Sequence, residues 1–191
     1  MSTIAALDPS ISLLNGTNGD SLYEIVNGKK VELPSMGVYA SWIAKRLAFF
    51  LDAIVDAGRL GAVVIETLFI LDNVRNIRRR PDVAFVSASK WSVGQPLPEI
   101  GDWNVVPDLA VEVISPNDVF QEVLKKMEEY FSLGVAQVWV VVPSQRQIYR
   151  YESPTDLRIF TADEELEGGT MLPGLRLPIR SIFEQTPVIA P

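Results

Sequence analysis

Two carboxylates in strand-like segments are the side chains of this sequence best suited to metal chemistry. Glu112 lies in DLAVEVIS (108–115), and a carboxylate among buried valines is costly unless it is paired, hydrated or bound to metal. Asp82 follows Pro81 at the start of PDVAFVS (81–87). If these segments form neighbouring strands, both carboxylates can share a divalent cation. Mg²⁺ is usually held by one or two carboxylates plus water and substrate phosphates.

Asp108 lies on the same expected strand face as Glu112, because side chains alternate between the two faces of a strand. At the rise of a strand the two residues are roughly 13 Å apart. This distance is too long for both carboxylates to bind one ion directly. We therefore interpret Asp108 first as a strand-entry residue or an outer-sphere group behind the metal ligands, and only second as a ligand.

The composition limits the chemistry that this chain can perform. It contains no cysteine and no histidine, which excludes disulfides, thiolate metal sites, histidine-bound zinc and serine–histidine hydrolase triads. A catalyst here must use carboxylates, lysine, hydroxyl groups or a hard metal ion held by oxygen. The formal net charge of −7 argues against tight, sequence-independent binding of nucleic acid, but it leaves room for a local basic patch.

The densest basic run is formed by Arg78, Arg79 and Arg80, immediately before Pro81. These arginines could contact phosphates of a nucleic acid at the mouth of a cleft. A solvated turn is at least as good an interpretation, since runs of charge usually lie in solvent.

Four further side chains are expected mainly to stabilise the fold. Trp91 and Trp103 lie in a long loop at 88–107 and could stack on bases, although tryptophans in loops more often anchor the loop on the core. Glu24 and Glu66 are isolated carboxylates in strand-like segments, and structural roles are the better interpretation for both.

The elements that must position these residues form one domain. A chain of 191 residues with 48% hydrophobic and 21% charged residues is typical of a single globular unit. Residues 1–20 show no apolar period and are predicted to be a flexible tail, and residues 21–191 a single domain. We find no signal-peptide pattern and no apolar run that could cross a bilayer, and therefore expect a cytoplasmic protein with no membrane partner.

Strand signals dominate this domain. Strands are predicted at 62–71, 81–87, 108–115 and 137–142, a hairpin around Asn27-Gly28 within 23–33, and a second hairpin from 147–151 and 157–161. The segment 166–183 is expected to pack on the sheet edge. With two helices, this order predicts an α/β domain whose mixed central sheet is flanked by helices and extended by N- and C-terminal hairpins.

The two predicted helices have recognisable ends. The first spans 39–57 and is ended by Gly58. The second spans about 116–133, with Ser115 as its cap, Pro116 at its first position, Asp118 completing a capping box and Gly134 after its last turn.

Several motifs together resemble the Uma-two family of restriction endonuclease-like proteins, in the PD-(D/E)xK nuclease superfamily. They are RRPDVAFVS (79–87), PDLAVEVISPND (107–118), KMEEY (126–130), GVAQVWVVVP (134–143), YEIVNGKKVELP (23–34) and LPGLRLPIRSIF (172–183). The likeness covers roughly residues 21–184, and the combination is specific although a lone Pro-Asp pair would not be.

This resemblance implies a restriction endonuclease-like fold and a nuclease that uses Mg²⁺ or Mn²⁺ to cleave nucleic acid, with DNA as the expected substrate. It implies that Asp82 and Glu112 bind the metal. The superfamily lysine should follow two residues after the glutamate, where this chain has Ile114. The resemblance implies that Lys126, on the following helix, takes its place. A homodimer is the expected assembly, because restriction-type enzymes often pair to cut two strands.

The helical pattern gives Lys126 partial support. At 100° per residue, Lys126 lies roughly 20° outside the apolar stripe of the second helix, whereas Lys125 lies roughly 100° outside. The stripe comprises Val119, Phe120, Val123, Leu124, Met127, Tyr130 and Phe131. Lys126 can therefore lean towards the sheet, and Lys125 should lie in solvent. A lysine that extends along the apolar interface to reach water is the alternative interpretation of Lys126.

A second function stays open, namely a non-catalytic binding or oligomerisation module on a nuclease-like scaffold. It is favoured by Ile114 at the lysine position, by the net charge of −7 and by the sparse basic surface. The resemblance also shows a departure at Ala40, where the family often carries a histidine. A fold alone does not settle activity. Cation binding between Asp82 and Glu112 would distinguish the two functions.

Overall fold

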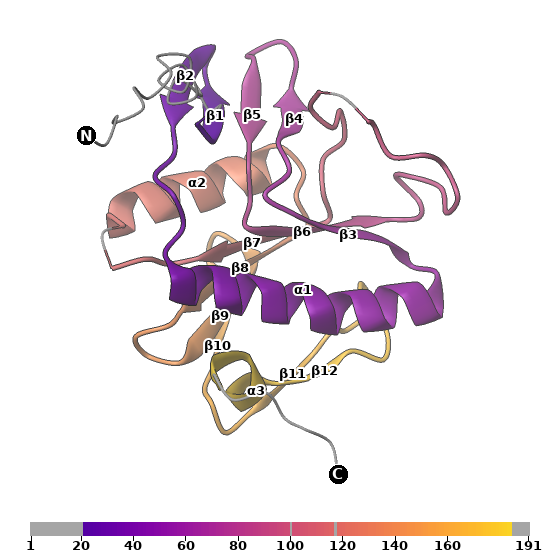
Figure 1. Cartoon of the computed structure of the whole chain (residues 1–191), viewed down its shortest axis with the longest axis vertical. Helices are drawn as coiled ribbons and strands as arrows, with labels where there is room; N and C mark the ends of the chain where they lie inside the picture. Colours follow the sequence, from indigo (N-terminus) through magenta and orange to yellow (C-terminus); the bar gives the residue numbers. More distant parts are fainter. Residues whose placement is uncertain (1–20, 100, 117, 185–191) are drawn as a thin grey trace, which may run out of the picture.

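The computed structural model describes residues 21–99, 101–116 and 118–184 (Figure 1). The tail predicted at 1–20 lies outside the described residues. The strands are β1 (Tyr23–Val26), β2 (Lys29–Glu32), β3 (Gly61–Ile65), β4 (Phe69–Asp72), β5 (Ile77–Arg79), β6 (Val83–Ser87), β7 (Leu109–Val113), β8 (Gln137–Val142), β9 (Gln147–Ser153), β10 (Asp156–Phe160), β11 (Glu165–Glu167) and β12 (Arg176–Pro178). The helices are α1 (Val38–Gly58), α2 (Phe120–Ser132) and α3 (Ile179–Phe183).

A six-stranded sheet in the order β10-β9-β8-β7-β6-β3 forms the centre of the molecule. Its β7 and β8 strands run parallel, and the other neighbouring pairs are antiparallel. Helix α1 packs on one face of this sheet and α2 on the other (Figure 1). The predicted α/β class, with a mixed sheet flanked by helices, is confirmed.

Alternation along β7 divides the core between the two faces of the sheet. Leu109, Val111 and Val113 are buried with α1, whereas Ala110 is buried on the α2 side. Glu112 is two residues from Ala110, and alternate residues of a strand point to the same face. Glu112 therefore points to the α2 side, as the sequence pattern predicts.

A second, four-stranded sheet in the order β2-β1-β5-β4 stands beyond the α2 face (Figure 1). The predicted hairpin is confirmed, because Asn27 (φ 49°) and Gly28 (φ 76°) have the positive φ values of a two-residue I′ turn. The single strand predicted at 62–71 is wrong. The chain leaves the large sheet after β3, turns at Glu66 (φ 46°) and enters the small sheet as β4.

The helix boundaries differ from the prediction at two points. Arg59 (φ 49°), not Gly58, takes the left-handed conformation after α1. Helix α2 begins at Phe120, after Val119, which makes no side-chain cap. Asp118 instead accepts a 2.7 Å hydrogen bond from the Ser115 N–H, so that the predicted capping residues form a turn before the helix. Gly134 (φ 94°) follows the last turn, as predicted.

The C-terminal region adds to the α1 side of the core. The predicted hairpin of β9 and β10 is confirmed. The segment expected at the sheet edge forms the β11–β12 pair and α3, and it buries Leu166, Leu177 and Ile182 in the core beside α1. Burial of these apolar side chains beside α1 stabilises the C-terminal region on this side of the sheet.

Candidate active site

Asp82 and Glu112 come together through the register of β6 and β7. In this antiparallel pair Val83 lies opposite Val111 and Ala84 opposite Ala110. Continued by one residue, the same register places Asp82 opposite Glu112, and residues opposite each other project from the same face. Both carboxylates therefore lie on the α2 side of the sheet, next to the junction with the small sheet.

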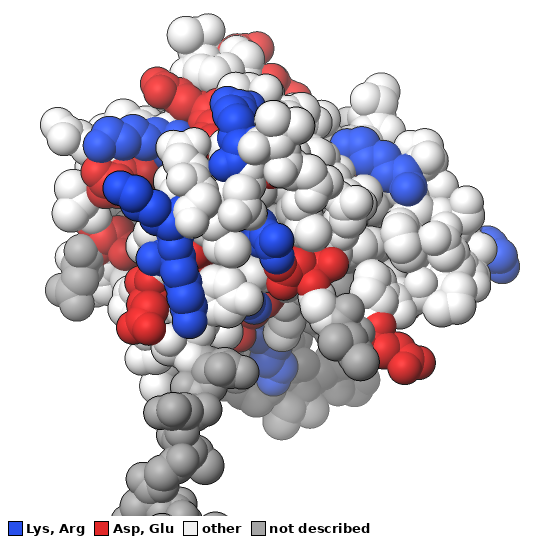
Figure 2. Space-filling model, turned by 90° about the horizontal axis from the view of Figure 1, so that it is seen from above, with Lys and Arg blue, Asp and Glu red and all other residues white. Residues whose placement is uncertain are grey.

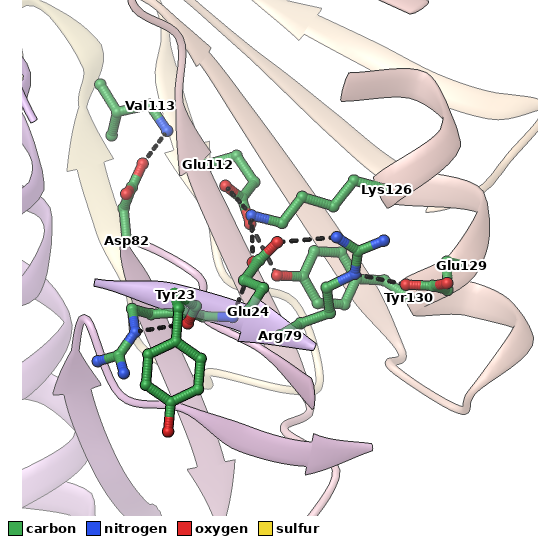
Figure 3. Close-up of polar contacts among 10 residues, drawn as sticks. Tyr23, Glu24, Arg79, Asp82, Glu112, Val113, Lys126, Glu129 and Tyr130 are labelled. Atoms are coloured by element: carbon green, nitrogen blue, oxygen red, sulfur yellow. Dashed lines mark hydrogen bonds and ion pairs between the residues drawn. The ribbon is translucent and has the colours of Figure 1, made fainter. Parts of the chain in front are cut away.

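Asp82 is held by the neighbouring strand. Its Oδ2 accepts a 2.6 Å hydrogen bond from the backbone N–H of Val113 (Figure 3). Burial raises the pKa of Asp82 to about 6, against the lowering effect of this hydrogen bond and of Lys126, and the nearby Glu66 and Asp118 raise it further. Proton binding at Asp82 would therefore compete with any cation bound there at pH values near 6.

Glu112 is held by two residues of α2. The Lys126 Nζ lies 2.9 Å from Glu112 Oε1 and 3.0 Å from Oε2, and the Tyr130 hydroxyl donates a 2.7 Å hydrogen bond to Oε1 (Figure 3). Burial raises the pKa of Glu112 to about 7, and the lowering effect of Lys126 only partly offsets it. Tyr130 itself is fully buried.

The helix orients Lys126 as the apolar pattern predicts. Lys126 and Tyr130 are one turn apart and so share the face of α2 that meets the sheet. The Lys126 side chain is 18% exposed, whereas that of Lys125 is 67% exposed and pairs with Glu122 at 2.8 Å. The expectation that Lys126 leans towards the sheet while Lys125 lies in solvent is confirmed.

Glu24 on β1 belongs to this cluster, although the sequence interpretation gave it a structural role. Its side chain is 3% exposed, and Oε1 lies 2.8 Å from the Lys126 Nζ. Burial raises the pKa of Glu24, but Lys126 and Arg79 outweigh burial and hold it below its usual range. A carboxylate in the apolar segment YEIV is the same signal that identified Glu112, and it could have drawn attention to Glu24.

Arg79 extends the cluster away from Asp82 and Glu112. Its guanidinium bonds Glu24 at 2.8 Å and Glu129 at 2.5 Å, and its side chain is 12% exposed. Burial by itself would lower the pKa of Arg79. The two glutamates outweigh this effect and raise the pKa above its usual value, so the guanidinium stays charged. Figure 3 shows the resulting chain of contacts from Glu129 through Arg79, Glu24 and Lys126 to Glu112.

The other two arginines of the basic run also have partners within the chain. Arg78 pairs with Asp102. The Arg80 side chain donates to the carbonyl oxygens of Tyr23 and Glu66, where the chain crosses between the two sheets. The expected phosphate contacts of Arg78, Arg79 and Arg80 therefore stay a prediction, and Arg79 in particular faces carboxylates and not solvent.

Asp108 lies at the opposite end of β7 from Glu112. Its Oδ2 accepts a 2.7 Å hydrogen bond from the Ser87 N–H, and Oδ1 lies 3.1 Å from the Lys90 Nζ. These contacts fit the first interpretation, a residue that fixes the entry of the strand. Among the described residues, none of its contacts joins it to the Glu112 cluster.

The two loop tryptophans anchor the long loop. Trp103 is 3% exposed and stacks on Phe69 with ring centroids 5.5 Å apart. Trp91 meets the Trp103 ring edge-on at 5.3 Å. This arrangement confirms the anchoring interpretation, because the Trp103 ring is buried against Phe69 and Trp91.

The donor set of Asp82 and Glu112 fits a hard divalent cation. Together with Lys126 and Asp118 they line a hollow of about 140 Å³. Within the described part of the chain, no group of three or more acidic, cysteine or histidine side chains could hold a metal ion unaided. Water or substrate phosphate would have to complete the shell, as Mg²⁺ usually requires. A cation's charge would also offset the burial that raises both carboxylate pKa values.

Comparison with known proteins now identifies the family. The profile of the Uma2 family, described as "putative restriction endonuclease", matches residues 11–180. The chain belongs to the Uma2 family. The resemblance inferred from the sequence motifs is thereby confirmed. A search of curated proteins gives no match.

A solved structure has the same fold as this Uma2 chain. It is the crystal structure of a protein described as "a putative nuclease belonging to DUF820" from Anabaena variabilis ATCC 29413. The two share 19% sequence identity and superimpose with a TM-score of 0.73, over 90% of this chain and 94% of the other. In the described residues of the present structure, every helix is too short or too polar to span a membrane.

Proposed function

We propose that this protein is a divalent-metal-dependent nuclease that hydrolyses phosphodiester bonds of nucleic acid, with DNA as the expected substrate and Mg²⁺ or Mn²⁺ as the cofactor. One observation carries the proposal. Asp82 immediately before β6, Glu112 on β7 and Lys126 on α2 line the same small hollow. Two carboxylates beside a buried ammonium group are a suitable arrangement for a reaction that builds negative charge on phosphate.

Asp82 and Glu112 would hold the cation in this site. When bound, such a cation supplies positive charge to the phosphate and lowers the pKa of water. Burial lowers the pKa of Lys126, but Glu112 and Glu24 outweigh burial and raise it above its usual range. Lys126 therefore stays protonated, so it can donate hydrogen bonds to phosphate or water but is unsuited to act as a general base.

A substrate strand could reach the site along α2. A larger hollow of about 560 Å³ runs between the N-terminal hairpin and α2, and its lining includes Glu24, Glu112, Lys125 and Lys126. Basic and acidic side chains lie interspersed over the face seen from the small sheet (Figure 2). This mixed charge favours a substrate that is bound locally at the site over one held by a broad positive surface.

The alternative is a binding or oligomerisation module without catalysis. Arg78 and Arg79 bind carboxylates of the same chain, which favours this alternative because it leaves fewer basic groups for phosphate. The alternative predicts normal folding without cation-dependent cleavage.

A cleavage assay tests the proposal. Supercoiled plasmid and single- and double-stranded DNA and RNA oligonucleotides would be incubated with the protein and Mg²⁺ or Mn²⁺. We expect cleavage that depends on the cation and is lost in Asp82→Asn and Glu112→Gln. Asp108→Asn, a carboxylate change at the other end of β7, is the control. Equal cleavage by all variants would indicate a contaminating nuclease, and no cleavage of any substrate would favour the alternative.

The predicted homodimer is part of the proposal for a double-strand cutter. Light scattering of the purified protein, alone and with uncleavable DNA, measures the particle mass and so distinguishes a monomer from a dimer. A monomer under both conditions would contradict the dimer and restrict the expected activity to single-strand cuts.

A further inference from the structure

The Lys126 ammonium is shared between two carboxylates at nearly equal distances. Its Nζ lies 2.8 Å from Glu24 Oε1 and 2.9 Å from Glu112 Oε1. The two glutamates come from different sheets, Glu24 from β1 and Glu112 from β7. Neither carboxylate alone therefore determines where this ammonium lies.

Glu112 has its carboxylate engaged on both oxygens. Lys126 contacts Oε1 and Oε2, and Tyr130 donates a second hydrogen bond to Oε1. A divalent cation at Glu112 would repel the ammonium at such short range and would compete with it for the same oxygens. Cation binding therefore requires the contact between Lys126 and Glu112 to weaken.

Glu24 is the more firmly held of the two partners. It is almost fully buried, and besides Lys126 it accepts a 2.9 Å hydrogen bond from the Arg80 N–H and a 2.8 Å bond from the Arg79 side chain. Arg79 is fixed in turn by Glu129. This anchoring keeps the Glu24 carboxylate in place whatever Glu112 binds.

We infer that Glu24 is a positioning residue, which retains the Lys126 ammonium beside the site while a divalent cation takes Glu112. The inference rests on the proposed function, because it assigns a second partner to the lysine of that same site. Glu24 acts through Lys126 and is not itself placed against the cation or the phosphate. Without Glu24, the ammonium has Glu112 as its remaining carboxylate partner, and the cation must displace it from there.

Mn²⁺ titration by calorimetry tests this inference through a double-mutant cycle, which isolates the coupling between two residues. Glu24→Gln keeps the side-chain shape and removes the charge, and we expect it to weaken Mn²⁺ binding about tenfold. In the background of Lys126→Met the competing ammonium is gone. The same Glu24→Gln change should then alter Mn²⁺ binding by less than about twofold.

Glu122→Gln is the matched control, because it removes one charge from α2 at an exposed residue that contacts Lys125 and not Lys126. We expect Glu122→Gln to change Mn²⁺ binding by less than about twofold. If Glu24 acted only as a remote negative charge, Glu24→Gln would weaken binding equally with and without Lys126. That result would overturn the inference while leaving the metal site intact.

Failure of the proposed function would give a different pattern. Wild-type protein would then show no Mn²⁺ binding that Asp82→Asn and Glu112→Gln abolish, and the inference would fall with it. If Glu24→Gln does not fold, ¹⁵N NMR of the lysine ammonium groups in the wild type replaces it. The Lys126 signal should persist, protected from exchange, at saturating Mg²⁺, and its loss would contradict retention by Glu24.

Discussion

The Asp82 carboxylate accepts a 2.6 Å hydrogen bond from the backbone N–H of Val113, the residue that follows Glu112 on β7. The strand that carries one carboxylate of the candidate metal site thus fixes the orientation of the other. Their relative position depends on the backbone register of β6 and β7, which flexible side chains alone would not define. A site held in this way is organised before it binds a ligand.

Replacing Lys126 with methionine should remove most of the proposed nuclease activity. The ammonium is the one cationic side chain in contact with Glu112 among the described residues, and no other charged donor replaces it. Loss of a single charged donor from such a site typically reduces the turnover rate by about 100- to 1,000-fold. Cleavage rates of Lys126→Met at saturating substrate and Mg²⁺ measure the effect.

Lys125→Met is the matched control for that experiment. Lys125 is adjacent in sequence but exposed, with Glu122 as its partner. At saturating substrate, where any loss of substrate affinity is overcome, its cleavage rate should stay close to that of the wild type. Equal losses in both variants would show that helix charge, and not the placement of Lys126, supports cleavage.

Cation affinity should rise with pH between about 5 and 7 and then level off. Burial raises the pKa of Asp82 to about 6 and that of Glu112 to about 7, so below these values protons compete with the cation. Mn²⁺ titrations at pH 5, 6, 7 and 8 measure the dependence. Affinity that is constant over this range would contradict the assignment of these carboxylates as ligands.

The stability of the cation-free protein should respond to pH in the opposite direction. The folded-state pKa values of Asp82 and Glu112 lie above those of the unfolded chain, so the folded protein binds protons more tightly. Their contribution to the free energy of unfolding is therefore present at low pH and is lost as pH rises towards about 7. The double variant Asp82→Asn/Glu112→Gln should lack this decline in urea unfolding experiments.

Replacing Arg79 with methionine should destabilise the protein by roughly 3 kcal/mol, the lower end of the usual cost of breaking a buried ion pair. After this change Glu24, which is 3% exposed, has Lys126 as its remaining charged partner. The ion pair between Glu129 and the guanidinium is also lost. Urea unfolding at pH 7 measures the loss. A change no larger than that of Lys125→Met would show that the cluster does not stabilise the fold.

Replacing Trp103 with alanine should lower the free energy of unfolding by about 3–5 kcal/mol, the usual cost of deleting a buried aromatic side chain. Trp103 stacks on Phe69 and is buried in the core of the α2 side. Trp103→Phe retains a ring and should cost much less. Thermal unfolding compares the variants. A loss of DNA affinity without a loss of stability would restore the base-stacking interpretation.

The sequence predicted the site best where it depends on local periodicity. Strand alternation placed Glu112 on the correct face, and helical spacing distinguished Lys126 from Lys125. Both results follow from the geometry of single elements. The pairing of β6 with β7 then brings Asp82 to Glu112.

Features that depend on contacts between distant segments were missed. Glu24 reaches Arg79 across 55 positions of the chain, and a single sequence without its fold does not show such a pairing. The apolar run at 62–71 has no Gly or Pro to mark its break, so the turn at Glu66 and the transfer to a second sheet were hidden. In that second sheet β1 pairs with β5, which places Glu24 beside Lys126.

Calorimetric titration of the wild-type protein with Mn²⁺ at pH 7.5, beside Asp82→Asn, Glu112→Gln and the control Asp108→Asn, tests the central claim most directly. The first titration uses the cation alone, and a non-hydrolysable DNA analogue is added only if the cation alone does not bind. The account predicts saturable binding that each of the first two changes abolishes and that Asp108→Asn retains. Binding that survives both Asp82→Asn and Glu112→Gln, or the absence of binding even with a non-hydrolysable DNA analogue present, would contradict a metal site between these two strands.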